Sequence, residues 1–103
     1  MKAPADCHSM PELRAEIDRL DAELVAKLVE RAGYIDRACE LKKANGLPAR
    51  IEERVEEVVA KVTARAQADG LDPALVEELW RRLIEWSIAR EERRLGPDTL
   101  KRD

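Results

Sequence analysis

The stretch from Leu13 to Lys42 constrains the fold of this chain more than any other part of the sequence. Its apolar residues recur in steps of three, four or seven, which is the spacing of one buried helical face: Leu13, Ile17, Leu20, Leu24, Leu28, Ile35 and Ala38. The same steps also reach Arg31 and Lys42, and Arg14 borders the stripe near its start. Because a buried cation without a partner is costly, either carboxylates of the protein or an anionic ligand must neutralise these groups.

The expected first helix is long for so small a chain. Ser9 and Glu12 have the spacing of a capping box, and Asn45 with Gly46 follows the expected last residue, Ala44, as a stop signal. A helix of some 35 residues is about 50 Å long at 1.5 Å per residue. Alone it would expose its apolar stripe, so we expect it to cross into a second copy of the chain.

Two shorter helices should follow, the second over about Arg50 to Ala68 and the third from Pro73 to about Leu95, with Asp72 as its N-cap. The second carries an apolar face of Ile51, Val55, Val58, Val59, Val62 and Ala66, and the third an inner face of Leu79, Trp80, Leu83, Ile84, Ser87 and Glu91. We therefore expect an all-α fold of three helices, one long and two shorter, in an intertwined homodimer. Residues 1–8 should form a flexible arm, 9–96 the helical domain and 97–103 a flexible tail.

Composition excludes several classes of protein. The chain has 103 residues, and 40% of them are charged, yet its net charge is only -3, so it lacks the basic field that favours nucleic acid. No run of about 18 apolar residues indicates a membrane span, and the start does not read as a signal peptide, so we expect a cytoplasmic protein. Cys7 and Cys39 should be free thiols, and one His with two Cys cannot build a standard zinc site.

The cations are spaced so that some of them can share a ligand. Arg31 and Lys42 differ by about 20° in direction and lie about 16 Å apart along a helix, so two extended side chains can converge on a molecule between them. Arg14 lies about 25 Å from Arg31 on the same helix. It can therefore serve such a site only in a partner protomer, which an antiparallel pairing of the long helices would allow.

Three further polar residues border the same interior. Arg54 lies at the edge of the apolar face of the second helix, and Ser87 and Glu91 form an i,i+4 pair on the third. Together with Arg14, Arg31 and Lys42 they would set four cations against one carboxylate. Such an excess of cations suits a small dianion such as a dicarboxylate.

The same residues allow an ordinary structural explanation. Arg14 can pair with Asp18 across one turn, Glu91 has Arg90 and Arg94 beside it, and long side chains at the edge of a face can extend to solvent. The pattern alone leaves both interpretations open.

Five segments resemble the all-helical chorismate mutase family, which includes the related isochorismate pyruvate lyases: LRAEIDRLDAEL, VERAG, CELKK, EERVEE and WSIARE. The resemblance runs from about Leu13 to Leu95. It implies that Arg14 reaches across the dimer, that Arg31 binds a substrate carboxylate, and that Lys42 contacts the ether oxygen and a carboxylate. Arg54 and Ser87 take matching positions, and Glu91 stands where the family has an ether-binding Gln or Glu.

Two positions depart from the usual mutase pattern. Family mutases often have a Glu directly after the Arg of the second helix, for the ring hydroxyl, and an Asp three residues before it. Here these positions are Val55 and Ile51. Such apolar residues are similar to what the lyase branch shows, whereas Glu91 departs from the Gln usual in that branch.

The resemblance implies that the chain converts chorismate to prephenate, a pericyclic step that requires no nucleophile, metal or cofactor. Arg14 and Arg31 would hold the two carboxylates, while Lys42 and Glu91 would donate to the ether oxygen as negative charge grows there. Glu91 can donate only when protonated, so activity should be greater at acidic pH. The alternatives are an isochorismate pyruvate lyase, which forms salicylate and pyruvate, and a non-catalytic helical dimerisation module.

Overall fold

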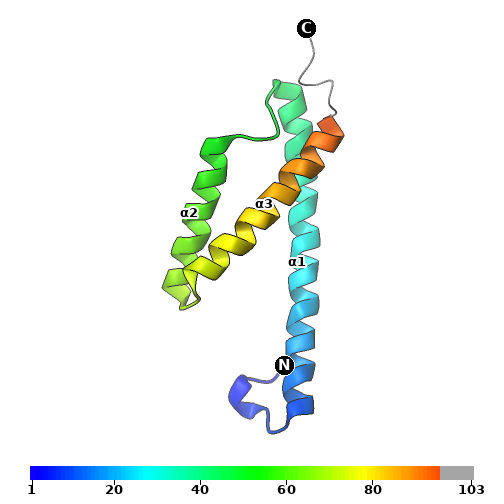
Figure 1. Ribbon diagram of the computed structural model, residues 1–103. Coiled ribbons are helices and arrows are strands. Elements are labelled where there is room, and N and C mark those ends of the chain that lie inside the picture. The colour runs from blue at the N-terminus through cyan, green and yellow to red at the C-terminus, as the bar shows by residue number, and fades with distance from the viewer. Residues whose placement is uncertain (96–103) are drawn as a thin grey trace. The chain divides into compact units, whose positions relative to one another are not determined.

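The computed structural model describes residues 1–95, which form three α-helices and one short 3-10 helix (Figure 1). They are η1 (Pro4–Asp6), α1 (Met10–Asn45), α2 (Glu52–Asp69) and α3 (Pro73–Leu95). No β-strand occurs in this range, so the predicted all-α class, with one long and two shorter helices, is confirmed. None of these helices combines the length and apolarity that crossing a membrane requires. The expected tail, 97–103, lies outside the described residues.

Local capping interactions set most helix ends where the sequence predicts them. The hydroxyl of Ser9 accepts a hydrogen bond from the backbone N–H of Glu12 at 3.3 Å and donates to the carboxylate of Glu12 at 3.4 Å. Asp72 Oδ1 accepts a hydrogen bond from the backbone N–H two residues further on, at 2.9 Å, near the start of α3. Gly46 and Gly70, which follow α1 and α2, have φ angles of 67° and 82°. This left-handed conformation suits glycine, and it stops both helices.

The chain divides into two units, Met1–Tyr34 and a second that begins at Ile35, and α1 runs through both. In the first unit, Lys2 links the N-terminal arm to α1. Its Nζ lies 2.6 Å from Glu12 Oε2, and its backbone nitrogen donates to Glu16 Oε1 at 3.2 Å. The flexibility of this arm stays a prediction.

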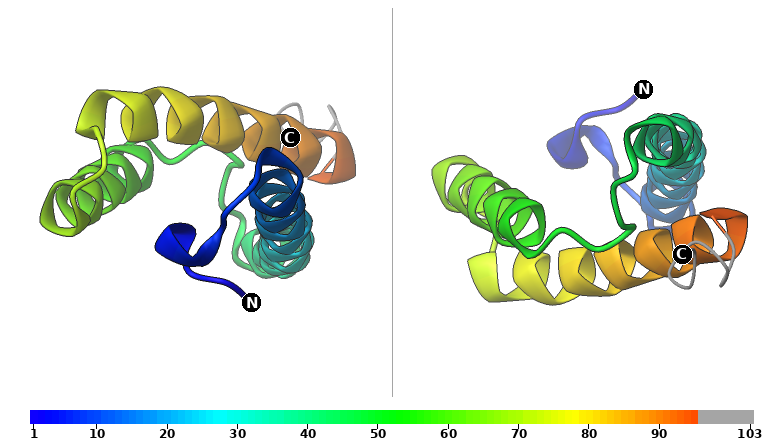
Figure 2. Two further views of the ribbon diagram at one scale, coloured as in Figure 1. Left: turned by 90° about the horizontal axis from the view of Figure 1, so that it is seen from below. Right: turned by 90° about the horizontal axis from the view of Figure 1, so that it is seen from above.

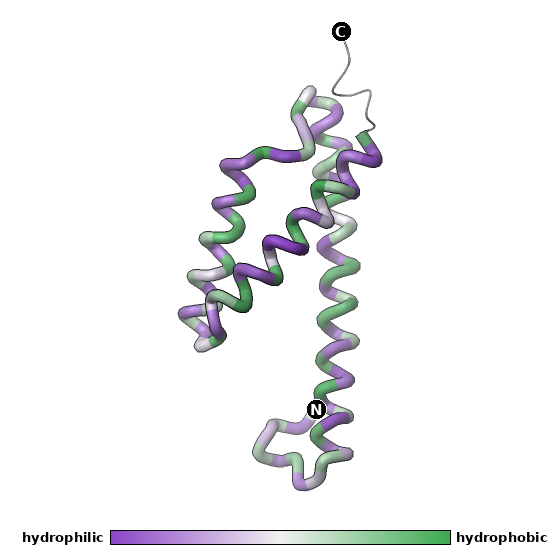
Figure 3. The backbone as a smooth tube through the Cα atoms, in the orientation of Figure 1, coloured by the Kyte–Doolittle hydropathy of each residue, from purple (hydrophilic) through white to green (hydrophobic). Residues whose placement is uncertain are grey.

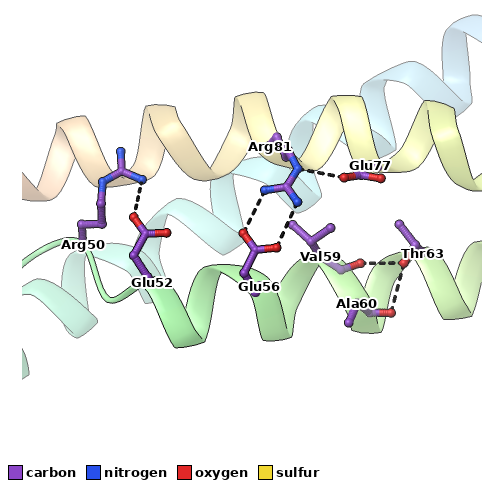
Figure 4. Close-up of polar contacts among 8 residues, drawn as sticks. All are labelled: Arg50, Glu52, Glu56, Val59, Ala60, Thr63, Glu77 and Arg81. Carbon is purple, nitrogen blue, oxygen red and sulfur yellow. Dashed lines mark hydrogen bonds and ion pairs between the residues drawn. The ribbon is translucent and has the colours of Figure 1, made fainter.

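In the second unit, α2 and α3 pack side by side and run in opposite directions (Figures 1 and 2). Their core joins one residue of α1 to residues of α2, α3 and the loop before α2: Cys39, Ala49, Val55, Val59, Ile84, Ile88 and Leu95. The predicted apolar face of α2 is confirmed, since Val55, Val59 and Ala66 are buried. Arg81 of α3 also binds Glu56 of α2 across the gap between the two helices (Figure 4).

The prediction that Leu79 lies on the inner face of α3 is wrong, because its side chain is 50% exposed. Leu79 precedes the buried Ile84 by five residues, which places it about 140° away around a helix. Val76 is buried at the start of α3 instead.

The predicted apolar stripe of α1 is not buried within one chain. Four of its members in the first unit are between 46% and 61% exposed: Ile17, Leu20, Leu24 and Leu28. Figure 3 shows apolar residues recurring along this part of α1. Within the first unit only the short arm accompanies the helix, and it is too small to cover the stripe. Cys39 is the one buried residue of α1, at 5% exposure.

Candidate functional site

Lys42, near the end of α1, and Glu91, near the end of α3, form a charged pair in the second unit. Lys42 Nζ lies 2.7 Å from Glu91 Oε1, and Glu91 is only 3% exposed. The same ammonium donates a hydrogen bond of 2.7 Å to the backbone carbonyl of Ala49, in the segment between α1 and α2. Lys42 therefore links the end of α1 both to the segment that follows it and to α3, 49 positions further along the chain.

Two polar residues are buried among residues 1–95, and both lie on one face of α3. They are Ser87 and Glu91, one helical turn apart. The Ser87 hydroxyl donates to the backbone carbonyl of Leu83 at 2.9 Å. A buried carboxylate is tolerated when a cation and hydrogen bonds compensate it, and Lys42 supplies both to Glu91.

The pair can do more than hold two helices together. An ammonium has three N–H donors, and Glu91 and Ala49 engage two of those of Lys42. A further donor can serve a polar atom of a ligand that binds beside the pair. In a poorly solvated place such a donor is worth more than it is in water.

The thiol of Cys39 contacts the backbone of Glu91, next to this pair. Its Sγ donates to the backbone carbonyl of Glu91 at 3.7 Å. Burial raises the pKa of the Cys39 thiol, and the nearby Glu91 charge raises it further, so the thiol stays neutral and unreactive. Both cysteines are free, as predicted. Among residues 1–95, no three His, Cys, Asp or Glu side chains gather as metal ligands would.

The second helix places its three predicted site residues in different surroundings. Arg54 is exposed, and its Nη1 lies 2.6 Å from Oε1 of Glu57 on the same helix. Val55 is buried in the core. Ile51 is half-buried at the N-cap of α2, where its carbonyl accepts hydrogen bonds from the backbone nitrogens of Arg54 and Val55. The guanidinium of Arg54 is thus engaged on its own helix in this structure.

The remaining predicted cations, Arg14 and Arg31, belong to the first unit. They lie on α1, the helix that also carries Lys42. Arg14 is exposed and Arg31 is half-buried.

Sequence reasoning missed two contacts at the site. The first is the Ala49 carbonyl, a backbone group of a loop that no side-chain pattern reveals. The second is an ion pair beside Glu91, in which the guanidinium of Arg90 binds Asp36 of α1. Asp36 precedes Lys42 by six residues, two steps of three, and this spacing was the available signal.

The fold and the pair define a class: a small all-α domain in which a half-buried Lys and a buried Glu join the first and third helices. The model of the family described as chorismate mutase type II matches residues 13–92. The chain belongs to this family, which confirms the resemblance noted from its sequence.

Two relatives show how the chain relates to whole proteins. A Pseudomonas aeruginosa protein named isochorismate pyruvate lyase is 35% identical over 92 residues, which cover 88% of this chain and 89% of the relative. A Haemophilus influenzae protein named T-protein is 30% identical over 95 residues. That alignment covers 92% of this chain but 25% of the T-protein, so the chain spans about a quarter of the longer relative.

Proposed function

We propose that this chain catalyses the rearrangement of chorismate to prephenate. The observation that carries the proposal is the contact between Lys42 and Glu91, 2.7 Å long and largely shielded from water, in a member of the chorismate mutase type II family. In this reaction the ether C–O bond breaks while a new C–C bond forms within the same molecule. No atom is gained or lost, and no nucleophile, oxidant or reductant is needed.

Lys42 and Glu91 would act on the ether oxygen. Negative charge grows on this atom as the C–O bond breaks, and donors fixed in advance at that point lower the barrier. Lys42 can contribute the donor that its protein contacts leave available. Glu91 can contribute an O–H donor in its protonated form.

The arginines would hold the substrate in its reactive conformation. Arg31 and the Arg14 of a partner protomer would each bind one carboxylate, because a guanidinium offers forked donors that match a carboxylate. Arg54 would join them by leaving Glu57, since exposed ion pairs of this kind contribute little stability. Ser87, Ile51 and Val55 would line the substrate-binding site.

The dimer is part of this proposal. The exposed stripe of Ile17, Leu20, Leu24 and Leu28 is an apolar surface of the kind that marks an interface. Arg14 and Arg31 lie about 25 Å apart along α1, so the Arg14 that meets the ligand of a given Arg31 would come from the other copy. A cytoplasmic location stays a prediction.

A second candidate function is cleavage of isochorismate to salicylate and pyruvate. Two observations favour it. The relative named isochorismate pyruvate lyase matches almost the whole of this chain, and Ile51 and Val55 give the start of α2 an apolar character. The ether bond also breaks in this reaction, so the same Lys42–Glu91 pair would serve it.

One experiment separates these functions. The purified protein is incubated with chorismate and with isochorismate in parallel, and the products are identified by chromatography and NMR. We expect prephenate from chorismate, with a higher kcat/KM than that for salicylate formation from isochorismate. Salicylate as the dominant product would select the lyase. Absence of both products would contradict catalysis and leave the dimerisation module.

A further inference from the structure

A second charged contact between α1 and α3 lies directly beside the Lys42–Glu91 pair. Arg90 Nε and Nη2 donate to the two carboxylate oxygens of Asp36 at 2.7 and 3.0 Å, and Arg94 Nε lies 3.3 Å from Asp36 Oδ1. The side chains of Arg90 and Asp36 are only 28% and 26% exposed. The guanidinium of Arg90 also lies over the ring of Trp86, 5.4 Å from its centroid. The proposed reaction gives this contact no role.

The contact belongs to a row of residues on α1 that meets α3 at two consecutive positions. Asp36, Cys39 and Lys42 follow one another at three-residue steps, which form a continuous row on a helix surface. Asp36 binds the Arg90 side chain, Cys39 donates to the Glu91 carbonyl, and Lys42 binds the Glu91 carboxylate. Adjacent residues on a helix point about 100° apart. Holding both side chains therefore fixes the rotation of α3 about its own axis.

The order of the charges also selects one arrangement. Along α1 the acidic Asp36 comes before the basic Lys42, and on α3 the basic Arg90 comes before the acidic Glu91. If α3 were placed so that the two pairs exchanged partners, Arg90 would meet Lys42 and Glu91 would meet Asp36. Like charges at contact distance repel, so this alternative is disfavoured. The hydrogen bond from Arg90 lowers the pKa of Asp36, with a further contribution from Arg94, so Asp36 carries its charge at neutral pH.

We propose that Asp36 and Arg90 are positioning residues, which set the rotation and register of α3 so that the carboxyl group of Glu91 meets the ammonium of Lys42. A two-point Arg–carboxylate contact is directional in a way that a single-point contact is not, and Trp86 further restricts the guanidinium. The inference deepens the proposed function, and its kinetic test rests on that function. Its stability test does not.

The chain offers a matched control on the same helix. Arg81 Nη1 and Nη2 bind the two carboxylate oxygens of Glu56, each at 3.1 Å (Figure 4). This pair links α2 to α3 with the same chemistry, but it has no contact with Lys42 or Glu91 among the described residues. Glu56→Gln and Asp36→Asn thus remove equivalent charges from the two Arg contacts. The Glu56 side chain is more exposed, at 60%, so kinetics are compared at a temperature where both variants are fully folded.

The stability test is a double-mutant cycle measured by urea unfolding at one protomer concentration. It compares the native sequence, Asp36→Asn, Glu91→Gln and the double variant. If Asp36 positions Glu91, the two substitutions are coupled, with an interaction factor of at least about fivefold in the unfolding equilibrium constant. The matched cycle of Glu56→Gln with Glu91→Gln should be additive within about twofold. Additivity in the Asp36 cycle, or equal coupling in both cycles, would overturn the proposal.

The kinetic test asks whether the substitution lowers kcat or raises KM. Asp36→Asn should lower kcat about tenfold with KM changed less than about threefold, because the displaced groups act mainly in the transition state. Asp36→Glu should recover part of the loss, and Glu56→Gln should change neither parameter. If Asp36→Asn fails to fold, Arg90→Lys keeps the charge but loses the two-point contact and should show the same loss in kcat. An unchanged kcat in a folded variant would overturn the proposal. If the native protein converts neither substrate, the proposed function fails, and the unfolding cycle alone decides the positioning role.

Discussion

At the scale of single residues, Glu91 is held in surroundings unusual for an acidic side chain. It is 3% exposed, with one ammonium against its carboxylate. A structural ion pair alone gives little reason for such burial, since apolar residues of similar volume often stabilise an interior equally well. A role as a hydrogen-bond donor to substrate gives a reason, and it depends on the protonation of this carboxyl group.

Glu91→Gln tests that role, because an amide donates without needing a proton from solution. We expect the native enzyme to form prephenate faster at acidic pH than at neutral pH, and the variant to show a much flatter profile. Initial rates at saturating chorismate, measured at acidic and at neutral pH in buffers of constant ionic strength, provide the comparison. A variant that keeps the native acid-favouring profile would reject Glu91 as the donor.

At the scale of the elements, local chemistry made the helices predictable. Ser9, Asp72 and the two helix-ending glycines act through neighbouring backbone groups, which the sequence displays directly. The rotation of α3 was less predictable, because Leu79 and Ile84 both fit an apolar periodicity and only packing against α2 chooses between them. The contact between Asp36 and Arg90 spans 54 positions, so the spacing of Asp36 from Lys42 could mark Asp36 as a candidate but could not identify its partner.

The contact of α1 with α3 should make stability depend on pH. Arg90 and Arg94 hold the pKa of Asp36 below its usual value in the folded state. A lowered carboxyl pKa stabilises the fold above the unfolded-state pKa, about 3.9, and this contribution is lost as the pH falls through the folded-state pKa. The stability difference between the native protein and Asp36→Asn should therefore shrink between pH 7 and pH 3. Urea unfolding across that range measures it, and a difference that stays constant would contradict the assignment.

At the scale of the whole molecule, the sequence indicates that the apolar stripe of α1 must pack against another surface. It does not identify that surface. Periodicity reports that a face is apolar, and the exposure of Ile17, Leu20, Leu24 and Leu28 shows that one chain does not bury it. An apolar periodicity within one chain does not identify the surface that covers such a face. The homodimer therefore stays a prediction.

Mixing two impaired variants tests the dimer and the crossing Arg14 together. Arg14→Ala and Arg31→Ala homodimers should each be poorly active. After subunit exchange, half of the dimers should be mixed, and each should hold one site with both arginines, which returns about a quarter of native activity. Prephenate formation before and after exchange measures the recovery. Lys42→Ala mixed with Arg31→Ala should recover nothing, since both residues belong to the same pocket, and equal recovery in the two mixtures would contradict a crossing Arg14.

The most direct test of catalysis compares two adjacent lysines. Lys42 contacts Glu91 and Ala49, whereas Lys43 is exposed on the same turn of α1. With both variants shown to be folded by circular dichroism, we measure kcat for prephenate formation from chorismate. The kcat of Lys42→Met should fall about a hundredfold or more, because the variant lacks one donor to a developing negative charge. The kcat of Lys43→Met should match that of the native enzyme. A folded Lys42→Met variant with native turnover would contradict the account.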